Sequence, residues 1–115
     1  MSDAGEGEVP GYHLLLEAEE IPVAGQALRL LISDEAHEPQ IRGIARSVID
    51  ELGAPADAEG RLTIELDAPQ MKITHGACRL LLNDLQREQA PERECLHAIL
   101  AKLPDEHTMR AITLD

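Results

Sequence analysis

The chain has 115 residues, with 10 Lys and Arg side chains against 22 Asp and Glu, and its formal net charge of −12 argues against binding to nucleic-acid phosphates. An apolar fraction of 43% and a charged fraction of 28% are typical of one ordinary globular domain. Tyr12 is the only residue among Phe, Trp and Tyr, which excludes sites built from stacked aromatic rings.

The first residues differ in composition from the rest of the chain. Residues 1–10 are acidic or small for the most part and include no Lys or Arg. Such a segment buries little surface, so we expect a disordered acidic arm followed by a single domain over residues 11–115. This start lacks the regions of a secretory signal, and no apolar run approaches the about 18 residues that span a bilayer. We therefore expect a cytoplasmic protein with no membrane contact and with reduced cysteines.

The domain contains two similar halves. A shift of 50 places residues 16–38 over residues 66–88. The identical pairs are Leu16/Leu66, Ala18/Ala68, Ala27/Ala77, Arg29/Arg79, Leu30/Leu80, Leu31/Leu81, Asp34/Asp84 and Glu38/Glu88. Similarity at a fixed period indicates a tandem duplication. It predicts repeats over about 12–53 and 61–104, joined by a small-residue linker at 53–60.

Each half predicts the same order of elements. Alternating or apolar runs at 12–17 and 61–66 are typical of β-strands. The segments that follow, 21–32 and 71–85, carry apolar residues over an arc of roughly 200°, which predicts helices buried on more than one side. Segments 38–52 and 90–103 restrict their apolar residues to roughly 140°, as expected of outer helices with one wet face.

The end of the chain alternates again, and residues 110–115 predict a third strand. Together the elements predict an α+β fold that is mostly helical. It is a tandem strand–helix–helix unit with pseudo-two-fold symmetry, two inner and two outer helices, and a small sheet of two or three strands. Because the wide apolar arcs need partners, we expect the inner helices to pack together at the centre.

Cysteine and histidine form the sharpest candidate for a metal site. His75 and Cys78 lie three residues apart, and Cys95 and His97 belong to the next helix. Both cysteines, however, stand where the first half has an aliphatic residue. We therefore expect two buried, reduced thiols that act as core residues, histidines on the polar sides of their helices, and no metal or cofactor.

The charges kept in both halves are the candidate site residues: Arg29 and Asp34, and Arg79 and Asp84. Within one helix the two charges lie about 140° apart around the axis and cannot easily pair. We predict crossed ion pairs at the interface of the repeats, Arg29 with Asp84 and Arg79 with Asp34. Solvated charges retained by chance, or a ligand-binding role, are the alternatives.

No spacing groups the carboxylates with a nucleophile and a base, so we expect no catalytic residues and no enzymatic activity. The leading hypothesis is a protein-interaction or regulatory module whose acidic surface meets a basic or apolar protein surface. Apolar surface left uncovered by the second repeat would also allow a homodimer. The alternative is a small-ligand or metal-binding protein, an enzyme included, with a site between the two repeats.

Overall fold

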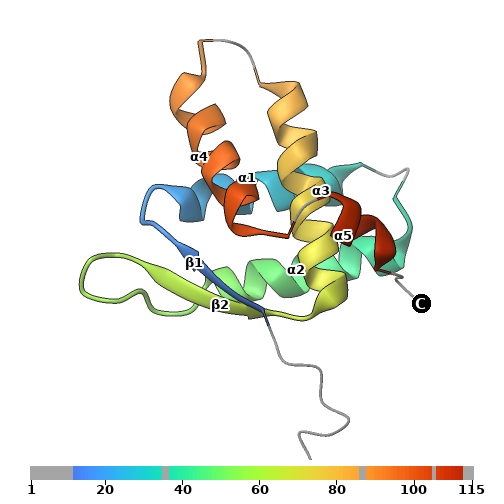
Figure 1. Ribbon diagram of the computed structural model, residues 1–115, viewed down its shortest axis with the longest axis horizontal. Helices are drawn as coiled ribbons and strands as arrows, with labels where there is room; N and C mark the ends of the chain where they lie inside the picture. Colours follow the sequence, from blue (N-terminus) through green and yellow to red (C-terminus); the bar gives the residue numbers. More distant parts are fainter. Residues whose placement is uncertain (1–11, 35–36, 86–87, 105, 113–115) are drawn as a thin grey trace, which may run out of the picture.

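The computed structural model describes residues 12–34, 37–85, 88–104 and 106–112. Strand β1 (Tyr12–Leu16) is followed by helices α1 (Glu20–Ser33) and α2 (Pro39–Leu52), and strand β2 (Leu62–Leu66) by helices α3 (Ala68–Asp84), α4 (Ala90–Lys102) and α5 (Glu106–Ala111). The fold is therefore α+β and mostly helical, as the sequence predicts (Figure 1). The acidic arm expected at residues 1–10 lies outside the described residues.

The two strands form one antiparallel sheet with a dry face and a wet face. Leu14 pairs with Ile64 and Leu16 pairs with Leu62 in the register. These four side chains are at most 4% exposed, whereas Leu15, on the opposite face, is 42% exposed. A two-stranded sheet is marginal in water on its own, so its stability depends on the helices that cover it. Helix α2 packs against β2, and α4 packs against β1.

Helices α1 and α3 form the centre of the molecule. Their mutual contact is the most extensive among the helix pairs, and both also contact α2 and α4. Small side chains at the crossing let the backbones approach closely, since Ala27 and Ala77 are fully buried beside Leu28 and Cys78. The expectation that the two inner helices pack together is confirmed.

The start of α3 is fixed by a capping box. The Asp67 carboxylate accepts a hydrogen bond of 2.9 Å from the Gln70 amide, and the Gln70 side chain accepts one of 2.9 Å from the Asp67 amide. The Gln70 side-chain nitrogen also donates to Ser47 Oγ on α2 at 3.0 Å. A similar hydrogen bond precedes α1, where the amide of Glu17 donates to Glu20 Oε1 at 2.8 Å.

The prediction of a third strand at residues 110–115 is wrong for Arg110 and Ala111, which belong to α5. Residues 113–115 lie outside the described residues. The helix forms because α5 contacts α3 and buries Met109, which is 3% exposed. Lys72 Nζ on α3 also donates to the Ile112 carbonyl at 2.6 Å, so that this carbonyl is bound by a side chain and not by a strand. The described sheet therefore has two strands.

None of the helices in the described part of the chain is both long enough and apolar enough to cross a bilayer.

Candidate functional site

The four candidate charges, Arg29, Asp34, Arg79 and Asp84, belong to or follow the central helices α1 and α3. Asp34 and Asp84 line one hollow of about 300 Å³, together with Leu30, Ser33, Leu80 and Asn83. Asp34 also contacts His37, with 3.6 Å between Oδ2 and Nδ1. The structure therefore brings the two aspartates to a common hollow.

Arg29 and Arg79 line two different hollows. Arg79 lines a second hollow along α3. Arg29 lines a third, between α1 and α2, and a Cβ added at Gly25 would lie only 3.2 Å from its guanidinium. The Arg29 side chain is thus directed back along α1, as long helical side chains usually are. The crossed ion pairing of these charges stays a prediction.

The two thiols differ from each other. Cys78 is fully buried between the central helices, as predicted. Cys95 is only half-buried on α4, so its predicted burial is wrong; its Sγ lies 3.7 Å from the Glu19 carbonyl at the start of α1. The prediction that His75 lies on the polar side of its helix is also wrong, because His75 is buried, with 8% exposure. Both thiols are free, and among the described residues no cluster of three metal-ligating side chains occurs.

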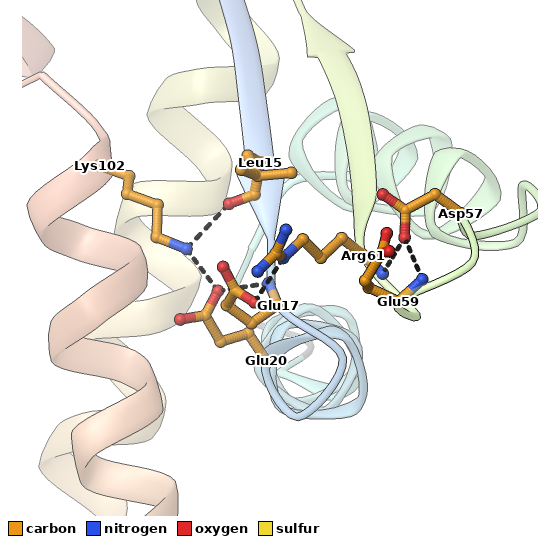
Figure 2. A network of polar contacts seen from close by, with 7 residues as sticks. All are labelled: Leu15, Glu17, Glu20, Asp57, Glu59, Arg61 and Lys102. Carbon is orange, nitrogen blue, oxygen red and sulfur yellow. Dashed lines mark hydrogen bonds and ion pairs between the residues drawn. The ribbon is translucent and has the colours of Figure 1, made fainter.

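A network of polar contacts ties the end of α4 to β1 and to the start of α1 (Figure 2). Lys102 Nζ donates to the Leu15 carbonyl at 2.8 Å and to Glu20 Oε1 at 2.5 Å. The Glu20 side chain is 6% exposed and that of Lys102 is 31% exposed, so this ion pair is largely shielded from water. The Tyr12 hydroxyl donates to the Lys102 carbonyl and holds the same point of α4.

The network continues at the surface. Arg61 Nε donates to Glu17 Oε1 at 3.0 Å, and this contact raises the pKa of the Arg61 guanidinium. Asp57 Oδ1 accepts from the amides of Glu59 and Arg61 at 2.9 Å each, which orders the turn before β2. The contacts of Lys102 hold the end of α4 beside β1 and the start of α1, and a space between α4 and α1 lies next to them.

That space is a groove between the first turns of α1 and α4, which we call the α1–α4 groove. Its main hollow has a volume of about 360 Å³ and is lined by Glu19, Pro22, Val23, Gln26, Pro91, Glu92 and Cys95. A second hollow of about 280 Å³ shares Glu19, Pro91 and Cys95 with it and adds Glu20, Glu94 and Ala98. The floor is apolar, the rim carries carboxylates, and neither lining contains Lys or Arg.

The carboxylates of this groove affect the pKa of the Cys95 thiol. Partial burial raises its pKa first, and the carboxylates of Glu20, Glu19, Glu92 and Glu94 raise it further. Each carboxylate opposes formation of a thiolate because the two negative charges repel each other. A nucleophilic thiolate is therefore disfavoured at Cys95.

The sequence contains only a weak signal for this groove. Pro22 and Pro91 mark the beginnings of two helices, and acidic residues surround both. The sequence spacing does not predict that these two helix starts lie side by side, because this contact depends on how α4 packs against β1 and α1. Lys102 and Tyr12, whose contacts hold the end of α4 beside β1, were not among the predicted site residues.

No protein-family model, no curated protein and no solved structure matches this chain.

Proposed function

We propose that the protein is a non-catalytic interaction module that binds a basic, amphipathic segment of a partner protein in the α1–α4 groove. The observation that carries this proposal is the combination of apolar lining residues with carboxylates and no Lys or Arg in the lining. Val23, Pro22 and Pro91 offer apolar surface, and Glu19 and Glu92 stand beside it. A segment with apolar residues on one face and Lys or Arg along its edges complements both features.

The net charge of −12 supports the same kind of partner. A strongly negative chain attracts basic proteins over long range and raises the rate of encounter, while it repels nucleic-acid phosphates. It also disfavours a second copy of the chain as the occupant, because two such copies repel each other. We therefore infer that the groove binds a different protein, and that homodimerisation is the weaker alternative.

A binding role suits the chemistry of the two thiols better than catalysis does. Burial raises the pKa of Cys78 from 9.0 to about 12, and the acidic surroundings of Cys95 also raise its pKa. Both therefore stay protonated near neutral pH and are weak nucleophiles. Two free thiols also suit a reducing compartment, so we propose that the protein acts in the cytoplasm.

We further propose that the chain arose by tandem duplication of a strand–helix–helix unit, with an approximate two-fold axis between α1 and α3. Buried positions in the two inner helices correspond at a shift of 50: Val23, Ala24, Gly25, Ala27, Leu28 and Leu31 in α1, and Ile73, Thr74, His75, Ala77, Cys78 and Leu81 in α3. The bonds that precede these helices correspond as well, since Glu20 binds the Glu17 amide as Gln70 binds the Asp67 amide. Each outer helix packs against the strand of the other unit.

The experiment uses a helical peptide of about 18 residues, built from Leu on one face and Lys on the other, as the probe. Its affinity is measured by calorimetry for the full chain and for two charge-reversal pairs. The first pair, Glu19→Lys with Glu92→Lys, reverses the rim of the groove. The second pair, Asp50→Lys with Glu51→Lys, changes the net charge equally at the exposed end of α2.

We expect the groove pair to weaken binding at least about tenfold and the α2 pair less than about threefold, since only the first removes contacts. Equal weakening by both pairs would mean that the peptide follows net charge alone, and it would contradict the groove. Absence of binding at low salt would contradict the proposal as well. Far-UV circular dichroism of both pairs checks that the helices remain intact.

A further inference from the structure

The hollow that contains Arg79 differs from the α1–α4 groove in both place and charge. We call it the α3 hollow; its volume is about 430 Å³, and it lies between α3, the last turns of α1 and the residues around the start of α2. Its lining consists of Lys72, Ile73, Gly76, Arg79, Leu80 and Asn83 from α3, with Leu31, His37 and Ile41 opposite. The α3 residues recur at helical spacing and form one stripe along the helix. The α3 hollow shares no lining residue with the α1–α4 groove.

Its charge is opposite to that of the whole chain. Lys72 and Arg79 lie on its wall with His37, whereas its lining contains no Asp or Glu. The two cationic residues stand seven positions apart, about 10 Å along the helix. The Lys72 ammonium is held by its 2.6 Å bond to the Ile112 carbonyl and has further protons for a ligand.

Among the described residues, two carboxylates lie toward one end of the hollow. Asp34 contacts His37, and Asp34 and Asp84 line the adjoining hollow, which shares Leu80 and Asn83 with this one. Lys72 is the lining residue of α3 farthest in sequence from the shared residues Leu80 and Asn83, so we expect an anionic group to bind beside Lys72. The apolar part of the lining comes from half-buried Ile41 and Leu80, with smaller contributions from Leu31 and Ile73, which are 4% and 6% exposed.

Gly76 provides an independent observation. It lies in the interior of α3, where glycine is less favourable than alanine. A Cβ added there would meet no atom within 4 Å, so that neither crowding nor a positive φ calls for glycine at this position. The missing side chain leaves space in the middle of the wall that any larger residue would fill.

We propose that the α3 hollow binds a small organic carboxylate with an apolar body, with the carboxylate beside Lys72 and the body over the stripe at Gly76. The size of the hollow lies within the range of about 300–1,000 Å³ that is common for small-molecule sites. This site goes beyond the proposed protein-binding function and does not depend on it.

Octanoate is the probe, and ¹⁵N-labelled full-length protein is titrated with it in NMR spectra. We expect saturable shifts of the amides of Ile73, Gly76 and Leu80. Gly76→Leu fills the hollow and is expected to abolish these shifts while the protein stays folded. Gly43→Leu is the matched control, because Gly43 is also an exposed helical glycine with nothing within 4 Å and lies outside this hollow.

The charge requirement is tested separately. Lys72→Met is expected to weaken octanoate binding at least about tenfold, whereas Arg29→Met, which changes the net charge equally in another hollow, should weaken it less than about threefold. Octanol that binds as well as octanoate would reduce the site to an apolar patch and overturn the proposal. Inorganic phosphate that gives the same shifts would show that the apolar body is not recognised. No saturation by octanoate at about 5 mM, or full binding to Gly76→Leu, would also overturn it.

Discussion

Removal of the Lys102 ammonium is expected to destabilise the protein more than the loss of an ordinary surface charge. Lys102→Met keeps most of the aliphatic stem but removes the bonds to the Leu15 carbonyl and to Glu20. The Glu20 carboxylate, with a side chain only 6% exposed, would keep only its bond from the Glu17 amide. Exposed ion pairs contribute up to about 1 kcal/mol, and breaking a buried one costs about 3–5 kcal/mol. Because the Lys102 side chain is 31% exposed, we expect a loss of about 2 kcal/mol in the free energy of unfolding.

A double-mutant cycle isolates the pair. Glu20→Gln retains an oxygen that can accept from the Glu17 amide, as Gln70 does before α3. This substitution alone should cost about 1 kcal/mol, and the double variant little more than that, instead of the sum of about 3 kcal/mol. Urea unfolding followed by far-UV circular dichroism is the suitable assay, because the chain has no Trp and a single Tyr. A loss below about 0.5 kcal/mol for Lys102→Met, or strict additivity in the cycle, would refute the reasoning.

Four further outcomes follow from single side chains. Thr74→Val should raise the free energy of unfolding by about 1 kcal/mol in urea, because the buried Thr74 hydroxyl has no hydrogen-bond partner among the described residues; a decrease would contradict this. Asp67→Ala removes the cap of α3 and should lower the free energy of unfolding by about 1 kcal/mol in the same assay. The folded pKa of the Cys78 thiol, about 12, exceeds its ordinary value of 9.0, so the stability present below pH 9 should fall by up to about 1.4 kcal/mol per pH unit between 9 and 12. Cys78→Ala should remove this part of the pH dependence, and an unchanged slope would count against it. For the predicted crossed pairing, a cycle of Arg79→Met with Asp34→Asn should give a coupling of at least about 0.5 kcal/mol; zero coupling would reject the pair.

Both strands and the first four helices could be predicted from the sequence because local patterning of apolar residues specifies each of them. The apolar run at 12–17 contains β1, and the broad apolar arc at 21–32 belongs to the buried helix α1. The shift of 50 also identified which later segments would take the same structures. Pairing of α1 with α3 followed from the excess apolar surface of both helices, which no other predicted element could cover.

The predictions that were wrong concern features that depend on long-range packing. Residues 110–111 alternate like a strand, but burial of Met109 against α3 selects a helix. Comparison with the first half predicted a buried Cys95, yet this thiol is only half-buried and lines the α1–α4 groove. The end of α4 is bound through Lys102 to Glu20 and to Tyr12, which lie more than 80 residues away in sequence. Periodicity carries no information about such contacts.

The most direct measurement of the proposed function is the native-state rate at which N-ethylmaleimide modifies Cys95, with and without the saturating Leu and Lys peptide. Cys78 is fully buried, so the rate under native conditions reports Cys95 alone. A cation that merely approached the groove would stabilise the thiolate and accelerate the reaction. A peptide bound in the α1–α4 groove covers the thiol, and the account predicts a decrease in rate of at least about tenfold. An unchanged or increased rate at saturating peptide would contradict it.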